Sequence, residues 1–237
     1  MEILFEVKNS TGVITLNRPK ALNALNLNMA IQLSKKLKEW EEDNAVERVI
    51  LLGEGNHFCA GGDVKSVHLS GPFSELKREF FSKEYSLNLQ IKNFPKPYLS
   101  IWKGVVMGGG VGLSIYGDYR IATDSTKFAM PETSIGFFPD VGGSFFLSRM
   151  ENNIGKYLGL TGELIQCKDL LNFGLATHYC PEDKLEILIN QYILDGSIVS
   201  HEIENSSSFS EEKLDFINKN FTGDIYEIFK KITAKQD

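Results

Sequence analysis

The chain predicts an α/β fold, because short apolar strands alternate with longer amphipathic segments along its 237 residues. Its first part carries two strand-like runs, Ile3–Lys8 and Gly12–Asn17. A helix is predicted over Leu27–Glu42, because its apolar side chains recur at helical spacing. These side chains are Met29, Leu33, Leu37 and Trp40. With 42% hydrophobic residues, the chain can bury one substantial main core.

The alternation continues along the rest of the chain. Further strands are predicted near Arg48, Tyr98, Tyr119 and Phe128. Further helices are predicted over Phe73–Ile91, Gly109–Tyr116, Val141–Met150, Ile154–Leu160, Cys167–Phe173 and Pro181–Gln191. We expect a main domain over residues 1–195 and a C-terminal helical segment over residues 196–237. The reason is a linker-like run at Asn205–Ser208, which precedes polar helices over Glu211–Lys235.

The composition argues against several classes of partner. A net charge of -6 and a pI near 5.4 oppose general nucleic-acid binding. Cys59, Cys167 and Cys180 show no regular spacing, so we expect a reducing compartment and no disulfide framework. The chain shows no basic leader, no signal peptide and no apolar run long enough to span a bilayer. We therefore expect a soluble protein that does not bind membranes.

Two acids lie in an unusually apolar stretch, Phe128–Gly143. Glu132 and Asp140 have mostly apolar and glycine neighbours there, so both are expected to be desolvated and to have displaced pKa values. The prolines and glycines of the stretch exclude one long helix, so the acids should lie on a turning loop and converge on one substrate atom. A salt bridge inside a packed loop is the structural alternative.

Two glycine-rich segments each follow a strand-like run. Met107–Ile115 follows Tyr98–Trp102, and Asn56–Lys65 follows Val49–Gly53. Each segment can offer a backbone amide, and two amides aimed at one carbonyl oxygen form an oxyanion hole. Neither segment has the spacing of a dinucleotide-binding or phosphate-binding loop. Glycines that only allow a helix and a strand to pack closely are the alternative interpretation.

Other kinds of site find little support in the sequence. The histidines His57, His68, His178 and His201 lack the spacing of a zinc site, so no metal is expected. The Gly-x-Ser-x-Gly motif of a serine nucleophile is absent. Cys59 is interpreted as a small buried side chain rather than a nucleophile, and His57 as a structural residue.

The two glycine-rich segments, the acid-bearing stretch Phe128–Gly143 and the segment Val13–Leu25 together resemble the enoyl-CoA hydratase/isomerase (crotonase) superfamily. The likeness extends from about Glu6 to Pro181. It implies a spiral superhelix of ββα units followed by C-terminal helices, and an acyl-CoA thioester as the small-molecule substrate. Coenzyme A would be part of that substrate, so no separate cofactor is expected. We also consider a homo-oligomer, a cytoplasmic location in a bacterium and, in a eukaryote, the mitochondrial matrix after loss of a transit peptide.

The resemblance implies catalytic roles for individual residues. The amides of Gly62 and Gly109 would hold the thioester carbonyl. Glu132 and Asp140 would act on the acyl carbon and the attacking water. Glu84 matches a further substrate-contacting acid. Helical periodicity alone instead makes Glu84 a solvated residue, outside an apolar face of Phe80, Phe81, Tyr85 and Leu89.

The path of coenzyme A is expected to follow the first glycine-rich loop. Its lining residues would be Ala60, Gly62, Asp63 and Val64. The phosphates of coenzyme A need basic partners, for which Arg18, Lys20 and Lys65 are candidates, although each of them could equally be a solvated surface residue.

Two positions distinguish subfamilies within the superfamily. Hydratases that resemble this chain carry a second glutamate where Gly112 stands here, and a glycine where Asp140 stands. This exchange favours hydrolysis of a short branched 3-hydroxyacyl-CoA such as 3-hydroxyisobutyryl-CoA, as in valine breakdown, over hydration. Glu132 would be a general base on water or a nucleophile through a mixed anhydride. Asp140 and Glu84 would bind the substrate hydroxyl and orient the water.

Two further functions stay open at the level of the sequence. An enoyl-CoA hydratase or isomerase uses the same scaffold. A non-catalytic acyl-CoA-binding module is the third hypothesis, because hydrolases of this type look longer at the C-terminus.

Overall fold

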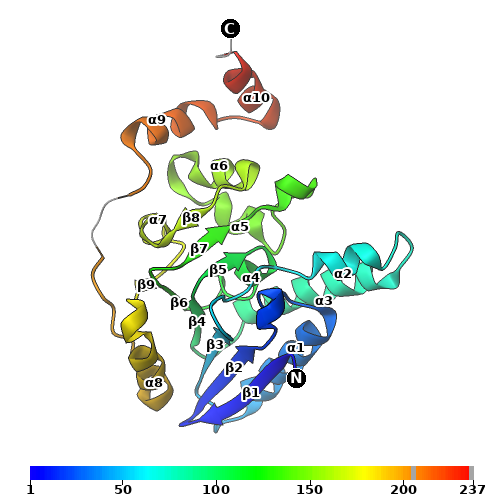
Figure 1. Cartoon of the computed structure of the whole chain (residues 1–237), viewed down its shortest axis with the longest axis vertical. Coiled ribbons are helices and arrows are strands. Elements are labelled where there is room, and N and C mark those ends of the chain that lie inside the picture. The colour runs from blue at the N-terminus through cyan, green and yellow to red at the C-terminus, as the bar shows by residue number, and fades with distance from the viewer. Residues whose placement is uncertain (204–206, 235–237) are drawn as a thin grey trace.

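The computed structural model describes residues 1–203 and 207–234 and shows two sheets surrounded by helices (Figure 1). Parts of two predicted elements lie outside these described residues. They are Asn205 and Ser206 of the linker-like run and Lys235 at the end of the predicted C-terminal helices.

The larger sheet has the strand order β1-β2-β3-β4-β6-β9. Its strands are β1 (Ile3–Lys8), β2 (Thr11–Leu16), β3 (Arg48–Gly53), β4 (Tyr98–Trp102), β6 (Tyr119–Ala122) and β9 (His178–Tyr179). The first two strands pair antiparallel, and every later neighbour in this sheet pairs parallel. Strand β4 is buried along its whole length, as expected for a central parallel strand covered on both faces.

The smaller sheet has the strand order β5-β7-β8, and its strands come between strands of the larger sheet in the sequence. Its strands are β5 (Val105–Met107), β7 (Lys127–Ala129) and β8 (Ile165–Gln166). The chain runs from β4 into β5 and then a helix, and from β6 into β7 and then further helices. Because β4 to β7 alternate between the two sheets and helices follow β5 and β7, the fold is the predicted spiral of ββα units.

The described residues contain ten α-helices and four short 3-10 turns. The α-helices are α1 (Leu27–Glu42), α2 (Val64–Leu69), α3 (Glu75–Lys92), α4 (Gly109–Gly112), α5 (Gly143–Leu147), α6 (Ile154–Thr161), α7 (Cys167–Asn172), α8 (Leu185–Asp195), α9 (Glu211–Asn220) and α10 (Ile225–Thr233). The 3-10 turns are η1 (Pro19–Ala21), η2 (Glu132–Ile135), η3 (Glu151–Asn153) and η4 (Glu182–Lys184). Helix α1 confirms its prediction, with the expected apolar face buried and the Asn26 side chain capping its first turn.

Two helices near the site are shorter than predicted. The helix predicted from Val141 starts at Gly143, because Val141 and Gly142 adopt positive φ angles of 43° and 78°, which a right-handed helix cannot contain. The helix predicted over Gly109–Tyr116 ends at Gly112, and the amide of Leu113 caps it by bonding to Gly109 O and Val111 O. The sequence also failed to predict α2, β5, β8 and β9, which are short elements held by tertiary contacts.

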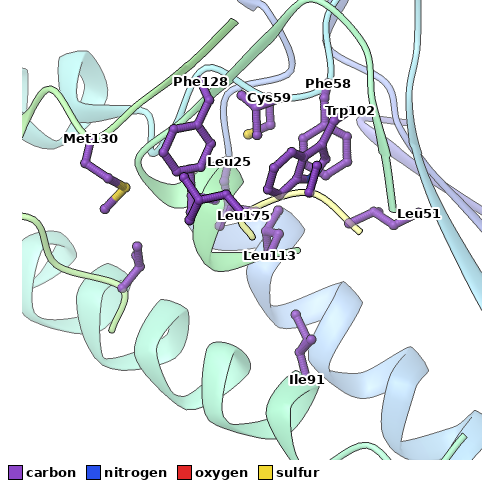
Figure 2. Close-up of a cluster of buried hydrophobic side chains, with 14 of the residues drawn as sticks. Leu25, Leu51, Phe58, Cys59, Ile91, Trp102, Leu113, Phe128, Met130 and Leu175 are labelled. Atoms are coloured by element: carbon purple, nitrogen blue, oxygen red, sulfur yellow. The ribbon is translucent and has the colours of Figure 1, made fainter. Parts of the chain in front are cut away.

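The main core lies between the sheets and helices α1 and α3. Figure 2 shows Phe58, Trp102 and Phe128 among its buried side chains, with Ile91 contributed by α3. The rings of Trp102 and Phe128 approach to 5.6 Å between centroids. Such burial of aromatic side chains fixes β4 and β7, and with them the loops that follow the strands.

The C-terminal helices α9 and α10 lie beyond α6, at the opposite end from the N-terminus (Figure 1). Phe209, Ile217 and Phe221 are buried in the same hydrophobic cluster as the main core. The carboxylate of Asp169 accepts hydrogen bonds from Ser207 and Ser208, which fastens the segment that leads to α9. The division at residue 195 coincides with the end of α8 and stays a prediction. Within the described residues, no helix has the length and apolar character needed to cross a bilayer.

Candidate active site

The parallel register of three segments brings the predicted site together. Cys59 forms a parallel bridge with Val106, and Val106 pairs in parallel with Phe128 of β7. The chain then continues for a further three residues from Cys59 to Gly62 and from Val106 to Gly109. From Phe128 it continues for four residues to Glu132. Because the carboxyl ends of parallel strands share one edge, the two glycines and the acid meet there.

The amides of Gly62 and Gly109 are both open. Gly62 is flanked by hydrogen bonds from Leu25 N to Gly61 O and from Asp63 N to Leu25 O, both 2.8 Å, so its own amide faces away from Leu25. Gly109 is the first residue of α4, where a helix leaves its amide unused. Among the described residues neither amide donates a hydrogen bond. A Cβ built on Gly109 would lie 2.9 Å from Gly62 N, so the two residues are neighbours.

Only glycine fits at positions 108 and 109 of the second glycine-rich loop. A Cβ on Gly109 would lie 2.4 Å from Glu84 Oε1, and one on Gly108 would lie 2.8 Å from Glu132 Oε1. Gly108 also has a φ angle of 46°, in the left-handed region. The loop glycines therefore make room for two carboxyl groups beside the open amides.

These groups line a cavity of about 460 Å³, a volume typical of small-molecule sites. Its lining includes seven of the predicted site residues. These are Ala60, Gly62, Val64, Glu84, Gly109, Glu132 and Asp140. Aromatic side chains form one wall, where Phe81 stacks on Phe137 with ring centroids 5.8 Å apart. An apolar wall beside converging acids suits the acyl end of a thioester.

Two glutamates are buried in this cavity without a full set of partners. Glu84 is 2% exposed and Glu132 is 8% exposed. Glu84 Oε1 and Glu132 Oε2 have no hydrogen-bond partner in the described residues. Burial raises the pKa of Glu84 to about 8, and the charges of Asp140 and Glu132 add to this rise. Burial also raises the pKa of Glu132 to about 7, with a further contribution from Asp140.

The burial of Glu84 overturns the interpretation drawn from helical periodicity. The buried side chains of α3 are Phe80, Glu84, Leu87, Asn88 and Ile91. The helix therefore turns an inner face that includes two polar residues toward the site, while Leu89 is 60% exposed.

Asp140 is held by a residue that the sequence did not indicate. The hydroxyl of Tyr85 donates a 2.7 Å hydrogen bond to Asp140 Oδ2. Burial raises the pKa of the Asp140 carboxyl, and the bond from Tyr85 partly opposes that rise. Tyr85 follows Glu84 on α3, so one helix supplies both an acid and the donor that orients another acid. Helical periodicity placed Tyr85 only on the apolar face of the helix, and its position next to Glu84 was the one signal of a role in the site.

Gly112 leaves no room for the glutamate of a hydratase. A Cβ on Gly112 would lie 2.6 Å from the Val141 Cβ and 2.9 Å from Asn88 Nδ2. Cβ atoms do not approach other atoms so closely, so any side chain there requires Val141 and its loop to move. The site therefore has no acid at position 112, and its packing leaves no space for one without such a movement.

Two other predicted residues lie elsewhere. The carboxylate of Asp63 accepts from Ser66 N at the start of α2 and pairs with Arg18 at 2.9 Å. Asp63 does not line the cavity, so its side chain has a structural role in this state. Lys20 lies exposed in η1 and also outside the cavity lining; its contact with coenzyme A stays a prediction.

Arg18 was a candidate to bind a phosphate of coenzyme A, but in the structure it bonds to other groups of the protein. Its guanidinium group is held by Asp63, by Glu2 at 3.0 Å and by the Ala24 carbonyl at 2.7 Å. Lys65 is exposed on α2, and its candidate role stays untested.

His57 and Cys59 are structural, as predicted. His57 Nδ1 accepts from the Val105 amide at 3.2 Å. Cys59 is fully buried, and burial raises the pKa of its thiol to about 12, which opposes a nucleophilic role. No cluster of three or more His, Cys, Asp or Glu side chains within residues 1–203 and 207–234 is arranged to hold a metal ion.

Comparison with known proteins agrees with this fold and site. A family model described as enoyl-CoA hydratase/isomerase matches residues 11–237. A solved structure of a carnitinyl-CoA dehydratase from Mycobacterium thermoresistibile is 39% identical, with a TM-score of 0.92 over 100% of this chain and 71% of that one. An enoyl-CoA hydratase from Rhodobacter sphaeroides is 35% identical, with the same TM-score, over 99% of this chain and 70% of its own. The chain belongs to the enoyl-CoA hydratase/isomerase family and has the crotonase fold.

Curated relatives carry a more specific name. A mitochondrial 3-hydroxyisobutyryl-CoA hydrolase from Danio rerio is 44% identical over 89% of this chain and 56% of its own length. The human protein of that name is 41% identical over 95% of this chain and 63% of its own length. A probable 3-hydroxyisobutyryl-CoA hydrolase 3 from Arabidopsis thaliana is 49% identical over 83% and 52%. The chain thus spans about half to two thirds of these relatives.

Proposed function

We propose that this cavity hydrolyses a short branched 3-hydroxyacyl-CoA thioester, with 3-hydroxyisobutyryl-CoA as the substrate. The observation that carries the proposal is the meeting of two unbonded amides, Gly62 and Gly109, with three carboxyl groups in one cavity. The names of the curated relatives support the choice of substrate. Coenzyme A is part of that substrate, and the reaction as proposed uses no separate cofactor.

The thioester carbonyl oxygen binds between the amides of Gly62 and Gly109, which stabilise the negative charge that develops when water adds. The oxygen of water forms a bond to the acyl carbon, and Glu132 takes one proton from it. The carbon–sulfur bond then breaks, and the proton on Glu132 passes to the sulfur. The products are the 3-hydroxy acid and free coenzyme A thiol, so atoms and charges balance.

The raised pKa of Glu132 supports its role as a base. A general base works best when its pKa lies near the working pH, and burial brings the pKa of Glu132 to about 7. A nucleophilic carboxylate would instead benefit from being fully ionised. We therefore favour attack by water over a mixed anhydride.

Glu84 acts as a neutral group in this proposal. It lies beside both amides, with Oε1 2.4 Å from a Cβ position on Gly109 and 3.8 Å from one on Gly62. A negative charge there would repel the developing oxyanion. With a pKa of about 8, Glu84 keeps its proton near neutral pH and can donate a hydrogen bond to the substrate. Asp140, oriented by Tyr85, accepts from the substrate hydroxyl or the attacking water.

A paired assay tests the proposal. Release of free thiol from 3-hydroxyisobutyryl-CoA is followed beside loss of crotonyl-CoA absorbance, with the same preparation. We expect thiol release and no hydration. Hydration without thiol release would identify a hydratase instead, and binding of coenzyme A without either reaction would identify a binding module.

Because the relatives named mitochondrial come from animals, we propose a mitochondrial location for a eukaryotic source of this chain.

A further inference from the structure

A second cavity lies away from the acyl cavity, and its wall includes residues of helices α5, α6, α7 and α9. Its volume is about 630 Å³, within the range of small-molecule sites. None of the residues that line it also lines the acyl cavity. A ligand of this cavity is therefore independent of the proposed function.

Much of the wall is apolar. Its partly buried apolar side chains are Ile115, Phe146, Met150, Phe173 and Leu214. They pack against the main core on one side and border the cavity with the part that stays exposed. Removing such surface from water favours the binding of an apolar chain, which a small inorganic anion does not have.

Arg120 brings a positive charge into this wall. Its Nε donates a 2.6 Å hydrogen bond to Leu175 O, and its Nη1 donates a 2.7 Å hydrogen bond to Gly117 O. Among the described residues its Nη2 has no acceptor, and this atom is not buried, so it can reach a ligand. Burial lowers the pKa of the guanidinium group, and the charge of Asp118 partly opposes this effect. Arg120 forms no ion pair in the described part of the chain.

Arg149 adds a second positive charge to the same wall. Its Nη1 donates a 2.6 Å hydrogen bond to Phe145 O, and the central carbon of its guanidinium group lies 3.7 Å from the centroid of the Phe145 ring. Within residues 1–203 and 207–234 it has no ion pair either. Glu151 is the one acid of the lining, so the wall carries an excess of positive charge in a chain whose net charge is -6.

We propose that this cavity binds a carboxylic acid with an unbranched apolar chain. The carboxylate pairs with Nη2 of Arg120, Arg149 adds positive charge, and the chain lies on the apolar wall. A guanidinium group is weakly hydrated, and its planar set of donors matches a carboxylate. The bonds to backbone carbonyls already hold both guanidinium groups in place, so binding orders little of the protein.

Calorimetry with decanoate, kept below its micelle concentration, tests the inference on the wild-type protein. We expect a Kd below about 1 mM. 1-Decanol lacks the charge and inorganic phosphate lacks the chain, so each should bind at least about 10-fold more weakly than decanoate. A crystal structure of the decanoate complex should show the carboxylate within about 3.2 Å of Arg120 Nη2.

Three variants examine the positive wall. Arg120→Met keeps an apolar stem but removes the guanidinium group, so the affinity for decanoate should fall at least about 10-fold. Because Arg120 also bonds to two carbonyls of the protein, the exposed Arg149 provides a second variant, Arg149→Met, with an expected loss of about threefold or more. Arg78→Met, at an exposed arginine of α3 outside the lining, should bind decanoate as wild type does.

The remaining outcomes would overturn the inference. They are no binding of decanoate at about 1 mM, decanoate seated in the acyl cavity of the crystal, and wild-type affinity in either Arg120→Met or Arg149→Met when the variant keeps its fold. Equal binding of 1-decanol would remove the arginines from the site, and equal binding of phosphate would remove the apolar wall. None of these measurements involves thiol release, so their failure is distinct from a failure of the proposed function.

Discussion

The hydroxyl of Tyr85 donates a 2.7 Å hydrogen bond to Asp140 Oδ2 and so ties helix α3 to the acid loop. Within the described part of the chain, Tyr85 is the one side chain that donates a hydrogen bond to the Asp140 carboxylate and so fixes its direction. The bond also favours the charged carboxylate against the effect of burial. Tyr85 is thus a positioning residue, which acts through Asp140.

Tyr85→Phe tests this positioning role. The change removes only the hydroxyl, so we expect kcat to fall about 10-fold while KM changes little. Because the bond stabilises the anion, its loss raises the pKa of Asp140, so the profile should show a step of Asp140 moved to higher pH beside the step that Glu132 causes. Tyr226→Phe, at a side chain 81% exposed on α10, is the control. A pH profile identical to that of wild type would remove Tyr85 from the account.

The pH dependence of kcat should be bell-shaped. Glu132 must lose its proton to act as a base, so the rate should rise through about pH 7. Glu84 must keep its proton beside the oxyanion, so the rate should fall through about pH 8. In Glu84→Gln the neutral amide cannot ionise, so the alkaline fall should disappear. An unchanged alkaline limb in this variant would show that another group causes it.

Stability should also depend on the protonation of Glu84. Its pKa is raised from 4.5 to about 8, so the folded state binds the proton more tightly than the unfolded chain. This contribution is full below pH 4.5 and is lost as the pH rises through about 8. Between about pH 5 and 9 the melting temperature of wild type should fall more than that of Glu84→Gln. The difference between the two falls should be about 3 °C or more. The exposed Glu186→Gln serves as control, and parallel curves for all three proteins would contradict the assignment.

Gly112→Ala tests the packing that separates this site from a hydratase. Its Cβ would lie 2.6 Å from the Val141 Cβ, so we expect a loss of about 1–3 kcal/mol in the free energy of unfolding, measured by denaturant titration. Gly159→Ala in α6 is the control, since its Cβ would meet the flexible end of Leu147 at 3.2 Å. Equal stability of the two variants would mean that Gly112 has room for a side chain.

Much of the site was predictable because its residues follow strands. Glu132 and Asp140 stand among apolar neighbours in the sequence, and the structure buries both carboxyl groups enough to raise their pKa values. Gly62 and Gly109 meet through the bridge between Cys59 and Val106, and Val106 lies in β5, a strand that the sequence did not predict.

The contribution of α3 could not be read from periodicity. That rule assigns apolar residues to the buried face, whereas α3 buries Glu84 and Asn88 and exposes Leu89. Asp63 was expected to line the path of coenzyme A because its loop matches the family, and that contact stays a prediction. In the structure its carboxylate caps α2 and pairs with Arg18. The ion pair joins residues 45 positions apart, so no local sequence pattern reveals it.

Thiol release by Glu132→Gln tests the central claim most directly. The glutamine keeps the shape of Glu132 but cannot take a proton from water, so we predict that kcat for 3-hydroxyisobutyryl-CoA falls at least about 100-fold. Binding of the substrate should be retained, and Glu186→Gln should match wild type. Thiol release by Glu132→Gln at the wild-type rate would contradict the account.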